Sequence, residues 1–282
     1  MSCLSVQLGS DDSEGYILKA VVFDTRNLSS ILKAINFKEM SIFCINEHGI
    51  RVMVEGAKCV QASAFIQTGI FHEFSAKDDA TFGINLNILL GCLNIFSGST
   101  TLVKMFYENH GYPLKLILEE KGVITDCCIQ TEEPDEGLDF DFQTPNVVNK
   151  IIMQSSLLKE AFHELDMTSE ILEILMSPDN PYLRLSTFGH AGTAHVDFPK
   201  DSEQMVSFEC TQTQTNRYKI TLLKPSTKAL DISNKISIRM DNRGFLSLQY
   251  MIVTEDGETC YIEYLCAPDE ETEEDRDVSA EE

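Results

Sequence analysis

The chain is short of basic residues and lacks the apolar runs that membrane proteins need. Among its 282 residues, 22 Lys and Arg face 45 Asp and Glu, so the formal net charge is −23. A uniformly spread charge of this kind argues against nucleic acid and anionic membranes, because both require clustered cations. The longest apolar stretch, Ile88 to Phe96, is too short to span a bilayer. Hydrophobic residues nevertheless make up 43% of the chain, which excludes global disorder.

The nine cysteines include no CxxC pair, which argues against a zinc site. The number of cysteines is odd, so they cannot all form disulfides within the chain, and most of them lie within apolar runs. The stretch Ser10–Gly15 is polar and acidic, unlike the apolar core of a signal peptide. A reducing compartment without structural disulfides is the favoured interpretation, and we expect no cofactor.

The acidic residues are concentrated in two segments. Residues 269–282 hold nine acids and one base, and residues 131–141 hold six acids and no base. The rest of the chain has 30 acids and 21 bases. Acidic runs usually repel one another and stay solvated, so these segments are expected to be a tail and a linker.

Helical periodicity occurs four times and in two matching pairs. Apolar stripes predict helices at Thr25–Asn36, Asn85–Phe96, Ser156–Leu165 and Arg217–Leu230. The second pair repeats the first at offsets of 131 and 132 residues, which indicates two copies of a unit of about 130 residues. Asn85 is a plausible N-cap, and Pro225 should bend or interrupt the last helix.

Between these helices the pattern is that of β-strands. Apolar and polar residues alternate over residues 50–55, 114–118 and 246–253. Such alternation is typical of strands with one buried face. Each half therefore reads as strands with helices on one face, an α+β fold.

Catalytic motifs are scarce. The chain has no GxSxG, P-loop or GxGxxG motif. His190, His195 and Asp197 could form a metal cluster, but a surface loop is the favoured interpretation. Asp139 and Asp141 form a D-x-D that a two-metal nuclease could use, although Leu138, Phe140 and Phe142 alternate as in an edge strand or docked connector.

The polar faces of three helices avoid carboxylates. Arg26 and Lys33 share a stripe of the first helix, and Arg217, Lys224 and Lys228 share a stripe of the last. The second helix exposes no acid either. Two interpretations stay open, an ordinary solvated helix face and a surface that contacts phosphates without reading sequence.

Two apolar residues stand on otherwise polar strand faces. Phe65 lies among Gln61, Ser63 and Gln67, and Met251 has a similar setting. A large apolar group on an exposed face marks a binding groove or packs under a loop.

Several stretches resemble the sliding DNA clamps, and among them the radiation-sensitivity-one branch of the nine-one-one checkpoint clamp. They are RNLSSILKAINF from Arg26, VEGAKCVQASAFIQTGIF from Val54, LDFDF from Leu138, NRYKITLLKPSTKAL from Asn216 and DNRGFLSLQYMI from Asp241. The resemblance implies two tandem clamp domains, with sheets outside and four helices on the inner face. The implied bounds are 1–129 and 143–268 for the domains, 130–142 for the connector and 269–282 for a disordered acidic tail.

The resemblance also implies a non-catalytic role. Two paralogous subunits would complete a 1:1:1 ring that a checkpoint clamp loader places on double-stranded DNA in the nucleus. The ring would recruit checkpoint and repair proteins through peptide motifs, with no role for a membrane. The alternatives are a homo-oligomeric replication clamp and a metal-dependent 3′–5′ exonuclease.

The family's functional surfaces can be carried over to particular residues of this chain. The implied DNA-facing residues are Arg26, Lys33, Lys159, Arg217, Lys219, Lys224 and Lys228. The implied peptide groove between connector and C-terminal sheet comprises Phe65, Leu138, Phe140, Met251 and Pro268.

Overall fold

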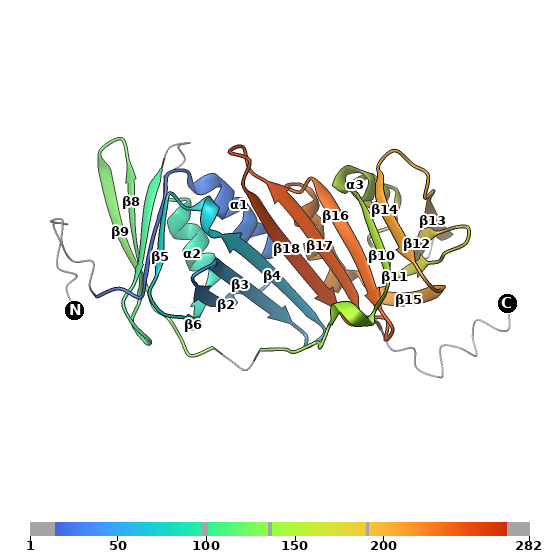
Figure 1. Cartoon of the computed structure of the whole chain (residues 1–282), viewed down its shortest axis with the longest axis horizontal. Coiled ribbons are helices and arrows are strands. Elements are labelled where there is room, and N and C mark those ends of the chain that lie inside the picture. Colours follow the sequence, from blue (N-terminus) through green and yellow to red (C-terminus); the bar gives the residue numbers. More distant parts are fainter. Residues whose placement is uncertain (1–14, 97–100, 135–136, 190–191, 270–282) are drawn as a thin grey trace.

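The computed structural model describes residues 15–96, 101–134, 137–189 and 192–269, which form two halves joined side by side (Figure 1). The first half comprises β1 (Leu18–Val22), α1 (Thr25–Ile35), β2 (Met40–Asn46), β3 (Gly49–Gly56), β4 (Val60–Gln67), η1 (Thr68–Ile70), β5 (Glu73–Ala76), β6 (Ala80–Asn85), α2 (Leu86–Leu93), β7 (Leu102–Tyr107), β8 (Leu114–Glu120) and β9 (Val123–Ile129). The second half comprises η2 (Thr144–Asn146), β10 (Val147–Gln154), α3 (Ser155–Glu164), β11 (Ile171–Met176), β12 (Leu183–Gly189), β13 (Gly192–Phe198), β14 (Met205–Cys210), β15 (Gln214–Lys219), α4 (Ile220–Leu223), η3 (Lys224–Ser226), α5 (Thr227–Leu230), β16 (Lys235–Asp241), β17 (Leu246–Val253) and β18 (Thr259–Cys266).

The internal repeat predicted from sequence is present. In the described residues, each half runs strand, helix, five strands, a helical segment and three strands. The acidic tail predicted to be disordered lies outside the described residues, apart from Asp269.

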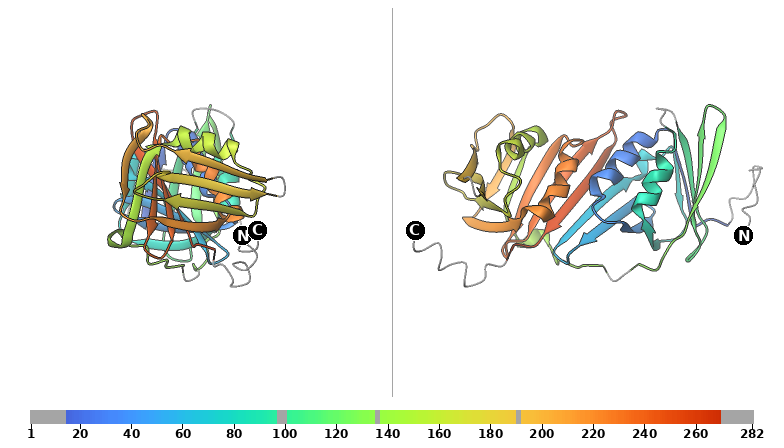
Figure 2. Two further views of the ribbon diagram at one scale, coloured as in Figure 1. Left: turned by 90° about the vertical axis from the view of Figure 1, so that its right-hand side faces the viewer. Right: turned by 180° about the vertical axis from the view of Figure 1, so that it is seen from behind.

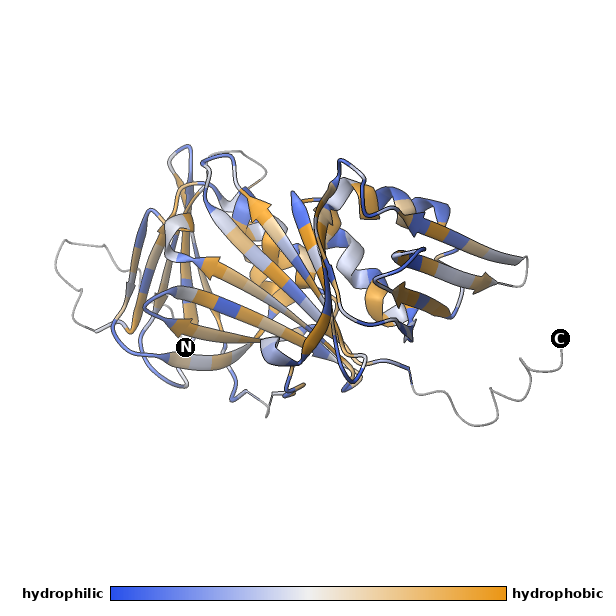
Figure 3. Ribbon diagram, turned by 45° about the vertical axis from the view of Figure 1, so that its right-hand side comes forward, coloured by the Kyte–Doolittle hydropathy of each residue, from blue (hydrophilic) through white to orange (hydrophobic). Residues whose placement is uncertain are grey.

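The strands form three antiparallel sheets in the described part of the chain. Their orders are β5-β1-β7-β8-β9, β14-β10-β16-β17-β18-β4-β3-β2-β6 and β13-β12-β11-β15. The nine-stranded sheet belongs to both halves, because β18 of the second half pairs with β4 of the first. Apolar and polar residues alternate along the strands (Figure 3), as predicted for β3, β8 and β17.

In the described residues the α-helices α1 to α5 lie on one side of the sheets, as the view from behind shows (Figure 2). Helix α1 begins where Asp24 caps its N-terminus by accepting a hydrogen bond of 2.9 Å from the Arg26 amide. Its apolar stripe, Leu28, Ile31, Leu32 and Ile35, is buried as predicted. Asn85 caps α2 through a 3.1 Å hydrogen bond from the Ile88 amide, which confirms the predicted N-cap.

The last predicted helix begins three residues late. Residues 217–219 belong to β15, which pairs with β11 and places Lys219 opposite Ile171. Tyr218 is buried and its hydroxyl donates to the Gly244 carbonyl at 2.7 Å, so this segment is held as a strand. The helix then runs from Ile220, and the 3₁₀ segment η3 interrupts it at Pro225, as predicted.

One buried hydrogen bond ties the two halves together. The Tyr264 hydroxyl of β18 donates to the Ala34 carbonyl of α1 at 2.6 Å. Ala34 lies in the last turn of α1, where carbonyls have no partner within the helix. Burial raises the pKa of Tyr264 well above its ordinary value, so the hydroxyl remains a donor.

Replacing Tyr264 with Phe should lower the free energy of unfolding by about 1–2 kcal/mol, because the buried Ala34 carbonyl loses its partner. Urea denaturation followed by circular dichroism measures this change. Tyr261→Phe is the control, since Tyr261 lies on the same strand but on its partly exposed face. Equal losses in the two variants would contradict the assignment.

Candidate nucleic-acid interface and peptide groove

Five of the seven predicted DNA-facing residues lie on one exposed surface formed by the helices (Figure 2). They are Arg26 and Lys33 on α1, Lys159 on α3, Lys224 on η3 and Lys228 on α5. Helix α1 contacts α2 on one side and α5 on the other, and α5 also contacts α3. We call this the helix surface.

Most of these cations already have a partner on the helix surface. Lys33 Nζ donates to Asn94 Oδ1 at 3.1 Å, and Lys228 Nζ donates to the Asn36 carbonyl at 3.2 Å. Lys159 pairs with Asp231 at 2.7 Å. Lys33 and Lys228 therefore keep their positive charge, because their partners are neutral oxygens, whereas the charge of Lys159 is offset by Asp231.

Arg26 is partly neutralised by its neighbour. Its guanidinium donates to both carboxylate oxygens of Asp24. This hydrogen bonding holds the pKa of Asp24 below its ordinary value, so the pair stays ionised at neutral pH. Arg26 therefore contributes less net positive potential than the sequence suggests.

Arg217 and Lys219 do not lie on a helix, contrary to the prediction. Both belong to β15, where Arg217 Nε donates to Glu173 Oε2 of β11 at 3.0 Å. Lys219 pairs with Asp269 at 3.4 Å. The hydrogen bonds to β11 outweigh the local helical periodicity, so that Arg217 is not on the predicted stripe and Lys219 is not on the predicted helix.

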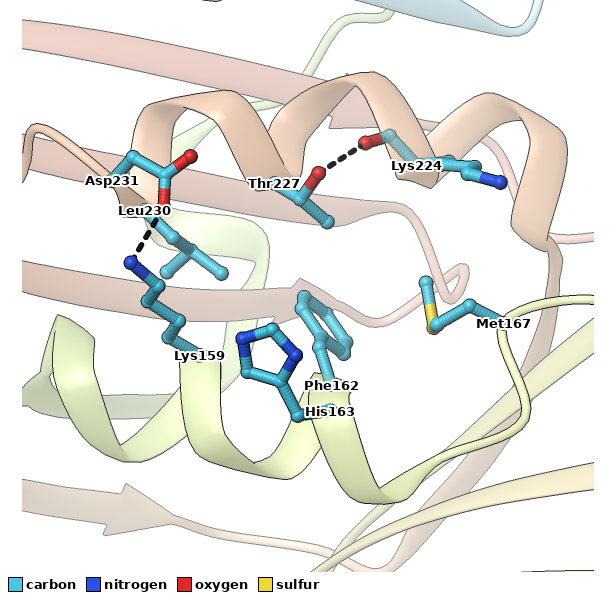
Figure 4. Close-up of a pocket in the computed structure, with 8 residues that line it drawn as sticks. All are labelled: Lys159, Phe162, His163, Met167, Lys224, Thr227, Leu230 and Asp231. Atoms are coloured by element: carbon cyan, nitrogen blue, oxygen red, sulfur yellow. Dashed lines mark hydrogen bonds and ion pairs between the residues drawn. The ribbon is translucent and has the colours of Figure 1, made fainter.

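A cavity between α3 and α5 escaped the sequence analysis. It has a volume of about 440 Å³, and we call it the helix slot (Figure 4). Its lining residues are Lys159, Phe162, His163, Met167, Lys224, Thr227, Leu230 and Asp231. Phe162 and Leu230 read as core residues in the sequence, and only the spacing of the two helices shows that they also line a cavity.

Residues 138–142 of the connector lie against the outer face of the nine-stranded sheet. Glu55 Oε1 accepts hydrogen bonds of 2.8 Å from the Leu138 amide and from Gln61 Nε2. Gln61 Nε2 also donates to the Leu138 carbonyl at 3.0 Å. Arg243 holds the next residues by donating to the Phe140 and Asp141 carbonyls, each at 3.0 Å.

The aromatic residues of the connector have partners as well. The Phe140 ring meets the edge of Phe245 at 5.8 Å, and the Arg239 guanidinium lies over Phe142 at 5.6 Å. Leu138 and Phe140 are therefore part of a docked connector. Glu55, Gln61, Arg239 and Arg243, which dock it, gave no signal in the sequence.

Phe65 and Met251, the predicted groove residues that lie on strands, belong to one row of side chains across the sheet. Strand pairing places Met251 opposite Tyr261, and Tyr261 opposite Phe65. The Arg51 guanidinium covers Phe65 at 5.2 Å. From Gln61, where Leu138 docks, to Phe65 is about 13 Å along β4. The row and the connector thus border a shared stretch of outer surface.

Pro268 lies at the boundary between the two halves. The amide of Ala267 donates to Cys59 of the first half at 2.9 Å, and the amide of Asp269 donates to Arg217 of the second at 2.7 Å. These bonds hold the segment around Pro268 between the β3–β4 turn and strand β15.

The possible metal ligands are engaged with protein groups. Asp139 Oδ1 accepts from the Asp141 amide at 2.8 Å, while Arg184 binds Asp197 and Ser186 contacts His195 Nδ1 at 2.8 Å. His195 and Asp197 lie on strand β13 rather than in a loop, and His190 is outside the described residues. Within the described ranges, no group of three or more His, Cys, Asp or Glu could hold a metal ion. No helix there is long and apolar enough to span a membrane.

Comparison with known proteins assigns a family. The family described as "Repair protein Rad1/Rec1/Rad17" matches residues 17–252. The chain is 59% identical over 280 residues to the Cell cycle checkpoint protein RAD1 of Homo sapiens, covering 97% of this chain and 99% of that protein.

Two more distant relatives carry different names. The DNA repair exonuclease REC1 of Mycosarcoma maydis is 27% identical over 231 residues, covering 62% of this chain and 50% of that protein. The DNA polymerase sliding clamp of Thermococcus fumicolans is 20% identical over 223 residues, covering 79% and 87%. Together with the repeated α+β halves, this likeness confirms the expected sliding-clamp fold, with its helices on one side of its sheets.

Replacing Glu55 with Ala should release the connector, because the Leu138 amide loses its acceptor. We expect amide hydrogen exchange in the connector to become about tenfold faster, while strands distant from Glu55 keep their protection. Mass-spectrometric hydrogen exchange on peptides covering 137–143 measures this. Glu47→Ala, in the exposed β2–β3 turn, should leave the connector unchanged. An unaltered connector in the Glu55 variant would show that other contacts hold it.

Proposed function

Since this chain belongs to the Rad1/Rec1/Rad17 family of repair proteins, we propose that it is a non-catalytic subunit of a ring-shaped DNA clamp of the DNA damage checkpoint. The ring comprises this chain and two paralogous subunits in a 1:1:1 ratio and acts in the nucleus. The main support for the proposal is that, in the described residues, two edge strands lack an outer neighbour although their equivalents in the other half have one.

The internal repeat identifies these edges. β18 pairs with β4 in the nine-stranded sheet, where the two halves meet. In the order of the repeat, β9 is the equivalent of β18, and β13 is the equivalent of β4. In the described residues both β9 and β13 are sheet edges without an outer partner.

The remaining edges do not share this property. β5 corresponds to β14 and β6 corresponds to β15, and in the described residues all four are edges. Among the edge strands of the described residues, only β9 and β13 have equivalents that are paired on both sides. A neighbouring subunit whose strand joins β9 would therefore extend the sheet as β4 extends it at β18, and the same joint at β13 closes a ring.

The exposed side chains of β9 suit such a joint. Val123 and Ile124 are 56% and 63% exposed, which is unusual for apolar residues on a regular strand. An uncovered apolar edge strand is an aggregation hazard unless another strand covers it. Pairing with a neighbouring subunit removes this hazard.

The edges of two identical chains match poorly, which favours paralogous neighbours over a homo-oligomer. With the register of the central joint, Ile124 would face Asp197, at the place where Tyr261 faces Phe65. Arg184 already binds Asp197 at 2.6 Å and lowers the pKa of its carboxyl group, so this group stays charged. An apolar residue opposite a charge is a weaker pair than two aromatic rings.

In the ring, the helix surface faces the DNA. Its lysines contact phosphates through weak, salt-sensitive interactions that carry no sequence preference. The acidic remainder of the chain repels DNA from the outside. Retention then depends on ring closure, and a dedicated clamp loader opens and closes the ring around DNA.

The outer surface serves as the platform for partner proteins. Checkpoint and repair proteins bind through peptide motifs at Phe65, Leu138, Phe140, Met251 and Pro268. The row from Met251 to Phe65 supplies apolar contacts, and the docked connector supplies one wall of the groove. This role requires no catalysis, in spite of the exonuclease named among the distant relatives.

Replacing both Lys224 and Lys228 with Glu should weaken retention of the assembled ring on circular duplex DNA and make loading inefficient, because two inner cations become anions. A loss of about tenfold or more at 100 mM salt is expected, with a smaller salt dependence. Gel filtration of the ring–DNA complex measures it. The control reverses Lys115 and Lys235, which lie on the outer sheet face. Equal behaviour of the two double variants would contradict the inner-face assignment.

Replacing Ile124 with Asp should disrupt assembly with the paralogous subunit next to β9 without unfolding the chain. We expect the fraction in the 1:1:1 ring to fall about tenfold, because a buried carboxylate replaces an apolar contact. Native mass spectrometry counts the subunits. Val253→Asp, at an exposed residue of the central strand β17, should assemble normally. A stable trimer of this chain alone would instead support the homo-oligomeric alternative.

A further inference from the structure

The helix slot combines an apolar floor with charged groups at its rim. Phe162 and Met167 are partly buried against the core, and Leu230 is buried, so the floor is fixed in place. In Figure 4 the side chains of Phe162, Leu230 and Thr227 project into the space between the two helices. The volume of about 440 Å³ lies within the range of small-ligand sites, about 300–1,000 Å³.

The charges of the slot are unevenly distributed. At one end, Lys159 pairs with Asp231, which closes that end and cancels its charge (Figure 4). Lys224 lies towards the opposite end with Met167, and within the described part of the chain its amino group has no hydrogen bond or ion pair. The exposed imidazole of His163 stands between these ends. The slot therefore offers one uncompensated cation next to an aromatic and thioether floor.

We propose that the helix slot binds a single unpaired nucleotide of DNA, with the base on the floor at Phe162 and Met167 and a phosphate at Lys224. Aromatic groups beside a cation bind nucleotides of any sequence, because every base has a stacking face and every nucleotide has a phosphate. A paired base cannot enter, since its faces are covered by its neighbours in the duplex.

The surroundings favour a nucleotide over an acidic peptide. Residues of α3, η3 and α5 that belong to the helix surface line the slot, whereas the row from Met251 to Phe65 and residues 138–142 of the connector belong to the outer face of the sheet. This step rests on the proposed function for the orientation of the helix surface towards DNA. Nucleotide binding in the slot adds to that function, because it lets this subunit distinguish DNA that contains unpaired nucleotides from continuous duplex.

Two variants test the slot in the full-length chain at low salt. Met167→Trp fills the cavity and leaves every charge, and Lys224→Gln removes the free cation. We expect each to weaken binding of a fluorescein-labelled twelve-nucleotide oligo(dT) about tenfold in anisotropy titrations. Met167→Trp should change duplex binding less than about twofold, whereas Lys224→Gln, which also removes a cation of the helix surface, should weaken duplex binding too, but less than oligo(dT) binding. Lys224→Arg should restore oligo(dT) binding. Lys228→Gln, on the helix surface outside the slot, should weaken both DNAs equally.

A second measurement keeps the test decisive if affinities are low. An oligonucleotide with 5-iododeoxyuridine should photocrosslink to the peptide spanning 159–167, and Met167→Trp should abolish that crosslink. Unchanged oligo(dT) binding in Met167→Trp, equal losses for duplex, or displacement of oligo(dT) by a peptide with the sequence of residues 270–282 at equimolar concentration would each overturn the proposal. These outcomes leave duplex retention by the Lys224 and Lys228 double variant as a separate test of the clamp function.

Discussion

The pairing of β18 with β4 is the constraint on which the rest of the molecule depends. It joins two repeated halves into one nine-stranded sheet. Because the sheet is continuous, α1 and α5 are brought into contact and form one helix surface. The same joint aligns Met251, Tyr261 and Phe65 in a row. Both proposed functional surfaces therefore rest on a single strand pair, one on each side of the same sheet.

The charge of the chain has a different meaning once its placement is known. A net charge of −23 argues against DNA binding only if it is spread evenly. The helix surface carries five cations, and most of them donate to neutral oxygens or to a single carboxylate. Such cations attract phosphates weakly, and salt screens them readily. Weak attraction inside and repulsion outside would suit the proposed clamp, which moves along the DNA that it encloses.

The repeat, the cap at Asn85 and the interruption at Pro225 could be predicted, because they show in the pattern of the sequence itself. Arg217 and Lys219 were assigned to a helix because local periodicity cannot detect the pairing of β15 with β11. The row of Phe65 and Met251 required the strand register, which tertiary pairing sets. The helix slot required the distance between α3 and α5. What sequence could not supply in each case was a contact between residues distant in the chain.

The two unmatched edges differ from each other, and this difference gives a ring direction. A joint between β9 of one subunit and the β13-like strand of the next is head-to-tail, so no two-fold axis relates the neighbours. Every subunit in such a ring therefore presents the same side upwards. The edge along which the connector runs then lies on one rim, and the turn between β17 and β18 lies on the other (Figure 1). A ring closed in this way has two unlike faces, so a protein that binds one rim is held in a fixed orientation along the DNA.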